Sequence, residues 1–221
     1  MTFTQTLRAV FPPPHPAGRP FVYGAAALTL LGLLFSVWIA ATGSVLLAFC
    51  FYFFRDPERV VPPRPGVLVA PADGHVVSVQ QIAPPEDLGL DPTPVWRIAT
   101  FLSVLDVHVN RMPAAGVVTR IAYHPGAFVS ASLDKASVVN ERNALAVRLT
   151  DGRNIAVVQI AGLIARRIVC QVAEGTAVQT GARFGIIRFG SRTDLYLPPG
   201  VVPLVAVGQT MVGGETVMGE L

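Results

Sequence analysis

The sequence predicts a mainly β domain, either a barrel or a sandwich, that follows an N-terminal apolar helical segment associated with a membrane. No charged residue occurs from Phe21 to Phe54, whereas one helix needs only about 20 apolar residues to cross a bilayer. From about residue 66 onward, short β-branched stretches alternate with Gly, Pro, Asn and Asp, which is typical of a β-rich domain. Charged residues make up 14% of the chain, against about 25% in an ordinary soluble domain, and this also favours partial burial in lipid.

These patterns divide the chain into a proline-rich head (1–20), a membrane-associated helical segment (21–54) and a β-rich domain (55–221). The apolar run is too long for one simple span. Thr42-Gly43-Ser44 lies near its middle and suits a tight turn, so we expect a hairpin of two short membrane helices. One long tilted helix is the alternative.

Positive charge flanks the apolar run on both sides. Arg8 and Arg19 precede it, and Arg55, Arg59 and Arg64 follow it. Because arginine and lysine are enriched on the cytoplasmic side of membrane segments, we expect both ends of the run, and the β-rich domain with them, on the cytoplasmic side of the cell membrane.

The expected strands are short and rich in valine and isoleucine. They are VLVA (67–70), HVVSVQQI (75–82), VWRIATFLSV (95–104), AGVVTRIAY (115–123), LAVRLT (145–150), NIAVVQIAG (154–162), RRIVCQV (166–172), FGIIRF (184–189) and VVPLVAVG (201–208). In residues 172–191 an EGT turn is followed by VQTG and a strand. This is the hammerhead pattern of lipoyl-like sandwich domains, in which glycines permit the tight turns.

Two classes of ligand are not expected. The chain has one lysine, and its arginines are scattered rather than gathered on one candidate helix, so we predict no nucleic-acid binding. Cys50 and Cys170 belong to no CxxC motif and to no Cys/His cluster with metal-ligand spacing, so we predict no metal.

Four positions have side chains suited to catalysis. Gly190-Ser191 directly follows an apolar strand, and a serine in a strained turn can attack the preceding carbonyl. Asp73 can orient a histidine, and His108 and His124 are candidate acid–base groups. Each also has an ordinary explanation: a β-turn, an Asx turn before a glycine, or a histidine that is merely hydrogen-bonded.

Several motifs occur together and in order along the chain. They are FFRDPERVVP (53–62), APADG (70–74), FLSVLDVHVNRMP (101–113), YHPGAF (123–128), NERN (140–143), AGLIARRI (161–168) and FGS (189–191). In this order they resemble the phosphatidylserine decarboxylase proenzymes, and more closely the short bacterial and archaeal form. The resemblance covers the chain from about Phe53 to about Pro203.

The resemblance implies autocatalytic cleavage between Gly190 and Ser191, which gives a β chain (1–190) and an α chain (191–221). Ser191 would become a pyruvoyl group, the cofactor, and form a Schiff base with phosphatidylserine. Decarboxylation would release CO2 and phosphatidylethanolamine. The implied partners are phosphatidylserine in the membrane and the two chains of one precursor as a heterodimer. Further oligomerisation is left open.

The sequence departs from the longer family members at two places. They have LGST at the cut where this chain has FGSR, and a second histidine where this chain has Arg111. The residue that activates Ser191 therefore does not carry over directly. We expect Asp73 to act with either His108 or His124, and His108 to be the proton donor in decarboxylation.

Two other functions compete with this one. A membrane-anchored lipoyl-like adaptor or carrier domain fits the hammerhead pattern and the apolar run. However, the only lysine, Lys135, lies in no hairpin between hydrophobic residues, and no heptad repeat is present. A pyruvoyl decarboxylase for a soluble amine precursor is the third possibility, and the apolar run disfavours it.

Overall fold

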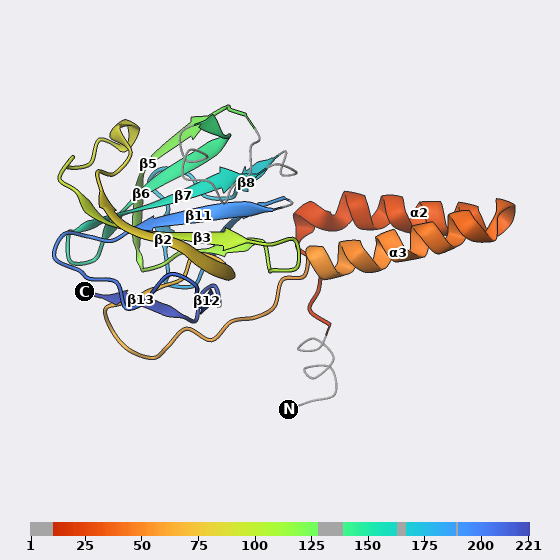
Figure 1. The fold of residues 1–221 in the computed structure, drawn as a ribbon, viewed down its shortest axis with the longest axis horizontal. Coiled ribbons are helices and arrows are strands. Elements are labelled where there is room, and N and C mark those ends of the chain that lie inside the picture. The colour runs from red at the N-terminus through yellow and green to blue at the C-terminus, as the bar shows by residue number, and fades with distance from the viewer. Residues whose placement is uncertain (1–10, 128–138, 163–166, 189) are drawn as a thin grey trace. The chain divides into compact units, whose positions relative to one another are not determined.

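The computed structural model describes residues 11–127, 139–162, 167–188 and 190–221, and it confirms a mainly β fold with an apolar N-terminal helical segment (Figure 1). The chain separates into two compact units, residues 1–58 and 59–221. The sequence also predicts one helical or irregular excursion from the strands at residues 127–140, and residues 128–138 of this stretch lie outside the described residues.

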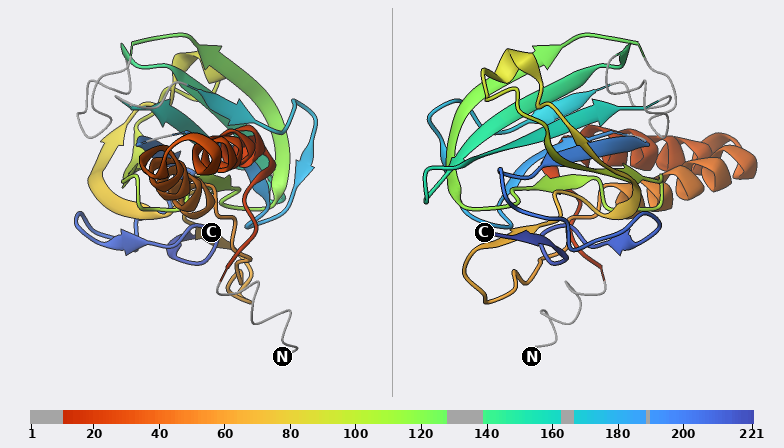
Figure 2. Two further views of the ribbon diagram at one scale, coloured as in Figure 1. Left: turned by 90° about the vertical axis from the view of Figure 1, so that its right-hand side faces the viewer. Right: turned by 60° about the vertical axis from the view of Figure 1, so that its left-hand side comes forward.

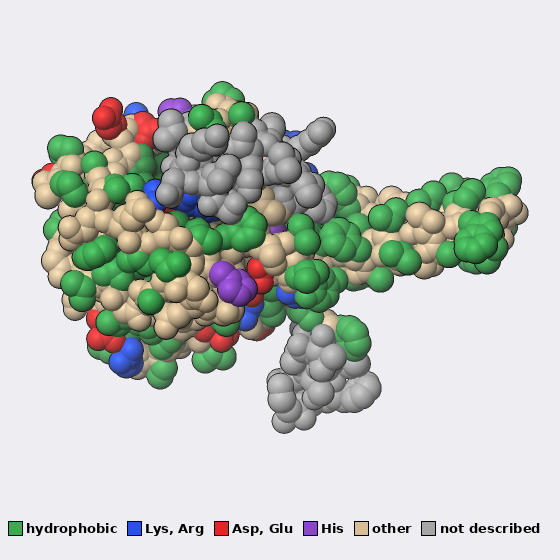
Figure 3. All heavy atoms as spheres, in the orientation of Figure 1, with side chains coloured by type: hydrophobic (Ala, Val, Ile, Leu, Met, Phe, Trp, Pro, Cys, Tyr) green, Lys and Arg blue, Asp and Glu red, His purple; other side chains and the backbone are tan. Residues whose placement is uncertain are grey.

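The first unit contains two apolar helices, α2 (Arg19–Phe35) and α3 (Val37–Phe53), after a short 3-10 helix η1 (Pro16–Gly18). The helical stretch Pro16–Phe35 is long and apolar enough to cross a membrane, and α3, at 17 residues, is slightly shorter. Apolar side chains such as Leu34, Phe35 and Trp38 are more than three-quarters exposed, and the helical surface in Figure 3 is largely hydrophobic. A helix that is apolar on its outward faces is suited to lipid.

The two helices pack against each other, but the break between them is not where the sequence indicated. It lies at Ser36, which is extended, whereas Thr42, Gly43 and Ser44 are inside α3. The reason is local. The hydroxyls of Thr42 and Ser44 donate to the carbonyls four residues earlier, at 2.9 Å each, so these residues remain satisfied within a helix.

The second unit is built from one large curled sheet and two small ones (Figure 2). Its strands are β1 (Val67–Val69), β2 (Gly74–Ile82), β3 (Val95–Leu102), β4 (Val109–Arg111), β5 (Gly116–His124), β6 (Arg142–Leu149), β7 (Asn154–Ala161), β8 (Ile168–Cys170), β9 (Ala177–Val178), β10 (Arg183–Ile187), β11 (Ser191–Tyr196), β12 (Thr210–Met211) and β13 (Val217–Glu220), with a 3-10 helix η2 (Glu86–Leu88). The large sheet has the order β12-β2-β3-β11-β7-β6-β5-β9, and the small ones are β4-β10-β8 and β1-β13.

The large sheet is buried on both faces. Side chains alternate along each strand, and the inner face forms the main core, which includes Ile98, Leu145, Val157 and Leu195. The outer face carries a second cluster that includes Ala156, Val158 and Tyr196 and packs against Leu88 of η2. The curl of the sheet encloses the inner face (Figure 2).

Most expected strands are present, but one is absent and several observed strands were not expected. Residues 201–208 (VVPLVAVG) form no strand, because Pro203 has no N–H to donate to a ladder. The short strands β4, β9, β12 and β13 were missed. The longest missed strand is β11, which begins at Ser191 and lies between β3 and β7 in the middle of the large sheet.

Candidate active site

Ser191 is the first residue of β11 and is fully buried. It pairs with Leu102 of β3 on one side and with Ala161 of β7 on the other. The residue before it, Gly190, has φ +62°, a left-handed conformation that a residue with a Cβ rarely adopts. The strand therefore starts with a sharp backbone turn at the peptide bond expected to be cut.

His108, in the loop directly before β4, contacts this peptide segment. Its Nε2 accepts a hydrogen bond from the backbone N–H of Gly190 at 3.3 Å, and its Nδ1 lies 2.9 Å from the carbonyl oxygen of Asp106. Because a carbonyl only accepts, Nδ1 carries the proton and the lone pair is on Nε2. The basic nitrogen of a fully buried histidine thus faces the Gly190–Ser191 junction.

A row of polar side chains crosses the inner face of the sheet next to Ser191. Thr100 of β3, Thr193 of β11, Gln159 of β7 and Asn143 of β6 pair directly across four adjacent strands, and all are at least 97% buried. Asn143 donates to Gln159 at 3.0 Å, and Gln159 donates to Asn110 of β4 at 2.8 Å. We call Thr100, Thr193, Gln159, Asn143 and Asn110 the polar row.

Four buried polar atoms in this region have no hydrogen-bond partner among the described residues: Thr100 Oγ1, Thr193 Oγ1, Asn110 Nδ2 and Ser191 Oγ. A buried polar group without a partner costs about 1–3 kcal/mol, and such groups in native structures call for an explanation. Concentrated around the serine, they are the sign of a functional site rather than of a core.

The outer face of β11 holds a buried charge cluster. Arg192 is fully buried, and its guanidinium donates to Asp194 at 2.6 Å from Nε and 2.8 Å from a terminal nitrogen. Arg97 of β3 lies 3.8 Å from the same carboxylate and donates to Ser78. Burial, and then the charge of Asp194, raise the pKa of Tyr196 to about 12.

Asp73 lies before β2 and is held by two donors. The guanidinium of Arg59 and the N–H of Gly213 each donate to it at 2.7 Å. Burial raises the pKa of Asp73, Arg59 and Gly213 oppose that rise, and Asp106 adds to it. The influence of Asp106 places Asp73 within electrostatic range of the loop that carries His108.

Replacing Arg59 by methionine is expected to raise the pKa of Asp73 further, because the main opposing charge is removed. Ionised Asp73 would then be buried without its charged donor, which is expected to cost about 1.5–3 kcal/mol of unfolding free energy at neutral pH. A carboxyl with a raised pKa in the folded state loses stability as pH rises through that pKa. The loss should therefore shrink below the ordinary Asp pKa of about 3.9.

Urea denaturation of Arg59→Met and its parent between acid and neutral pH measures this difference. The matched control is Arg64→Met, because Arg64 pairs with Glu220 at 2.7 Å at an exposed position, where a pair is worth about 0–1 kcal/mol. A pH-independent difference for Arg59→Met would contradict the assignment.

His124 lies apart from this group. It ends β5, pairs with Arg142 on the outer face of the sheet, and its Nε2 contacts the carboxylate of Asp87 in η2. Ser191, by contrast, has its side chain on the inner face with Thr193. Of the sequence candidates, the structure brings together Gly190, Ser191 and His108, whereas Asp73 is bonded to Arg59 and Gly213.

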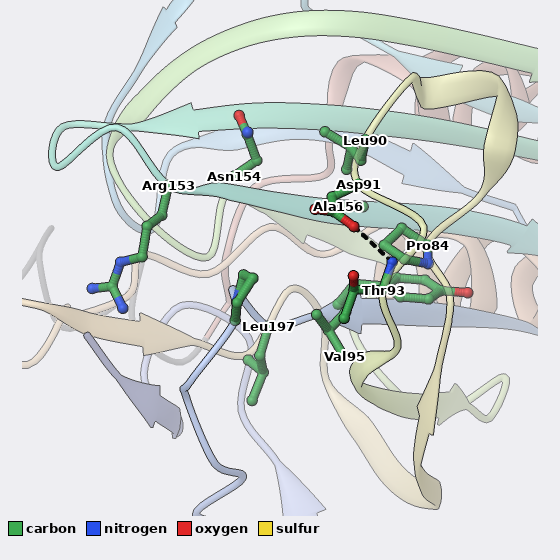
Figure 4. A pocket seen from close by; sticks show the side chains of 11 residues that line it. Pro84, Leu90, Asp91, Thr93, Val95, Arg153, Asn154, Ala156 and Leu197 are labelled. Atoms are coloured by element: carbon green, nitrogen blue, oxygen red, sulfur yellow. Dashed lines mark hydrogen bonds between the residues drawn. The ribbon is translucent and has the colours of Figure 1, made fainter.

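The described pockets do not include Ser191. One, of about 170 Å³, lies at the opposite end of β11 between η2 and the ends of β3 and β7, and it is lined by Leu90, Val95, Arg153 and Tyr196 among others (Figure 4). A larger one, of about 720 Å³, lies on the outer face beside Asp87 and Arg142. The described residues contain no cluster of histidine, cysteine and carboxylate side chains suited to a metal ion.

Sequence reasoning missed the polar row and the charge cluster. The available signal was a single polar residue inside an apolar strand, Thr100 in RIATFL and Gln159 in VVQIA. Their alignment depends on strand register, which the sequence pattern alone does not specify.

Comparison with known proteins places this geometry in a family. The family model for phosphatidylserine decarboxylase matches residues 46–219. A phosphatidylserine decarboxylase proenzyme from Granulibacter bethesdensis is 66% identical over 221 residues, covering all of this chain and 91% of that protein. Proteins of the same name from Gluconacetobacter diazotrophicus and Gluconobacter oxydans are 62% and 58% identical over the full length of both chains. The chain belongs to the phosphatidylserine decarboxylases, a family of carboxy-lyases.

Proposed function

We propose that this chain is a proenzyme that cleaves itself between Gly190 and Ser191, converts Ser191 to a pyruvoyl group, and decarboxylates phosphatidylserine to phosphatidylethanolamine and CO2. The observation that carries the proposal is the contact between His108 Nε2 and the N–H of Gly190, the residue that precedes Ser191 with its buried and unpaired hydroxyl. A nucleophile and a basic nitrogen at one strained junction are the parts that self-cleavage requires.

In the cleavage step, Ser191 Oγ attacks the carbonyl carbon of Gly190, the C–N bond breaks, and an ester replaces the amide. The hydroxyl proton passes to His108 Nε2 and then to the released nitrogen. Loss of the α proton of Ser191 breaks its Cβ–Oγ bond and leaves Gly190 as a carboxylate. Uptake of one water and release of one ammonia complete the conversion. Gly190 has no Cβ to obstruct this attack, and its positive φ is a conformation that favours glycine.

The residues around Ser191 fit the group that it would become. The side chain lies on the same face as Thr193, two residues along β11, and the hydroxyls of Ser191, Thr193 and Thr100 are all buried without a partner among the described residues. When formed, a pyruvoyl group supplies an electrophilic carbonyl and an electron sink for the loss of CO2. In this proposal His108 holds a proton at Nε2 for return to the product, and the carbonyl of Asp106 fixes the orientation of its ring.

The two chains produced by the cut are expected to stay together as a heterodimer. The α chain (191–221) would contribute β11, β12 and β13, and each pairs with strands of the β chain: β11 with β3 and β7, β12 with β2, and β13 with β1. The ladder pairing of residues 192–196 of β11 on both sides does not involve the peptide bond that is cut.

The apolar helices support attachment to the membrane that contains the substrate. Each is 17 residues long, about 26 Å at 1.5 Å per residue, close to the thickness of about 30 Å of a bilayer core. With arginines at both ends of the pair, we place the ends of the hairpin and the catalytic unit on the cytoplasmic side.

Intact mass spectrometry of the purified protein, beside a Ser191→Ala variant, tests the proposal. The parent should give two fragments, the smaller covering residues 191–221 and lighter by one ammonia than the same peptide with a serine amino terminus. Ser191→Ala should remain one chain with no decarboxylase activity. A folded parent that stays uncut would contradict self-cleavage and favour the adaptor function instead.

A further inference from the structure

The polar row offers hydrogen-bond donors on the inner face that no described residue accepts. Thr100 and Thr193 are paired neighbours on β3 and β11, and each hydroxyl is buried and unpaired. Thr193 follows Ser191 by two residues, so both side chains lie on the same face about 6.6 Å apart along the strand. The third unpaired donor is Nδ2 of Asn110.

The amide of Asn110 is held in one orientation by its neighbours. Gln159 uses its oxygen to accept from Asn143 and its nitrogen to donate to Asn110 Oδ1. Because Oδ1 of Asn110 already accepts a hydrogen bond from Gln159, the group of Asn110 that is available to a ligand is its NH2, which is a donor. Gly185 of β10 leaves space for the side chain of Gln159, because a Cβ at position 185 would lie 2.9 Å from Gln159 Nε2.

These features describe the ligand that the row would take. Three donors from neutral side chains lie on three strands, β3, β11 and β4. A carboxylate accepts hydrogen bonds without donating any, and it is the group that phosphatidylserine carries next to its amine. The row contains no cation of its own. Neutral donors bind a carboxylate less tightly than an arginine fork does, so they hold the group without strongly opposing its departure as CO2.

We propose that Thr100, Thr193 and Asn110 bind the α-carboxylate of the serine headgroup of phosphatidylserine, with Gln159 and Asn143 acting as positioning residues. This assignment rests on the proposed function of Ser191. The amine of the serine headgroup would be bound at position 191. The distance from this amine through the headgroup to a carboxylate oxygen, plus one hydrogen bond, is comparable to the spacing between Ser191 and Thr193 along the strand. After CO2 leaves, the donors have no carboxylate to bind, so the same row favours substrate over product.

The test uses Thr100→Val, Thr193→Val and Asn110→Asp in the full-length chain. Each valine has the shape of threonine without the hydroxyl. The aspartate keeps an acceptor for Gln159 and replaces the free donor by an oxygen. Thr119→Val is the matched control, because Thr119 Oγ1 donates to Ala146 at 3.3 Å, outside the row. Self-cleavage is followed by intact mass, stability by Tm, and turnover by kcat and KM.

Binding is measured separately from turnover. Borohydride treatment of the cut enzyme reduces its reactive ketone to an alcohol, and the treated protein is titrated with short-chain phosphatidylserine and with phosphatidylethanolamine of the same acyl chains. These two lipids differ only in the carboxylate. The variants should be cut normally, with the Tm of the valine variants equal to or above that of the parent. Their Kd for phosphatidylserine and their KM should rise about tenfold, the loss of one hydrogen bond to a charged group.

The Kd for phosphatidylethanolamine should not change in any variant, and Thr119→Val should match the parent in both lipids. Equal changes for the two lipids, or no change for phosphatidylserine, would overturn the assignment. Folded variants that remain uncut would overturn it as well, because the row would then serve cleavage. Failure of the unaltered chain to cut would instead count against the proposed function, and the two failures are therefore distinguishable.

Discussion

Replacing His108 by alanine is expected to lower kcat for decarboxylation by about 10²–10⁴-fold, the usual contribution of a general acid–base group. Its Nε2 faces the Gly190–Ser191 junction, and its Nδ1 is fixed by the carbonyl of Asp106. We expect self-cleavage to be slowed less than decarboxylation, because cleavage happens once and has hours to complete, whereas turnover requires a proton in every cycle. Gel analysis of cleavage and a CO2-release assay on the cut fraction measure the two effects.

The matched control is His75→Ala, because His75 is an exposed histidine of β2. That variant should cleave and turn over like the parent. A His108→Ala protein that is folded but entirely uncut would show that cleavage requires His108 absolutely, against the expected partial slowing, and an unchanged kcat in the cut fraction would remove His108 from decarboxylation.

Replacing Asp194 by alanine is expected to cost about 3–5 kcal/mol of unfolding free energy. Asp194 is 1% exposed and is shared by Arg192 and Arg97, so its removal leaves two buried guanidinium groups without their carboxylate. Breaking a buried ion pair by removing one partner is strongly destabilising, whereas replacing the pair by apolar residues is often neutral. The double variant Arg192→Met with Asp194→Leu should therefore be more stable than Asp194→Ala alone.

Denaturant unfolding measures these changes, with Asp151→Ala as the control. Asp151 pairs with Arg153 at 2.7 Å, but both side chains are 36% exposed, and such a pair is worth about 0–1 kcal/mol. Similar losses for Asp194→Ala and Asp151→Ala would show that the buried cluster contributes no more than a surface pair.

The sequence predicted which segments form helices and which form strands better than it predicted where those elements begin and end. The charge-free run from Phe21 to Phe54 and the β-branched stretches after residue 66 have strong periodic signals, and both were confirmed. The helix break was misplaced because Thr42 and Ser44 satisfy their hydroxyls within a helix. The residue types Thr, Gly and Ser alone therefore do not distinguish a turn from a continuing helix.

Strand β11 was missed for an electrostatic reason. Arg192 and Asp194 alternate with Thr193, and two charges in five residues are typical of an exposed turn. Here both charges are buried and bonded to each other, and periodicity cannot distinguish a buried ion pair from a solvated one. Ser191 and His108 were found through motif order, whereas the polar row depends on the register of four strands, two of which lie more than 40 residues apart in the chain.

The central position of β11 determines the order in which folding and cleavage can occur. On the proposed cleavage, the strand that starts at Ser191 is already hydrogen-bonded on both sides when its covalent connection to the rest of the sheet is lost. The 31-residue fragment is too short to build a core of its own, and rejoining it would require two chains to meet and insert a strand. Folding must therefore precede maturation, and heat or denaturant should inactivate the mature enzyme irreversibly while the uncut Ser191→Ala precursor can refold.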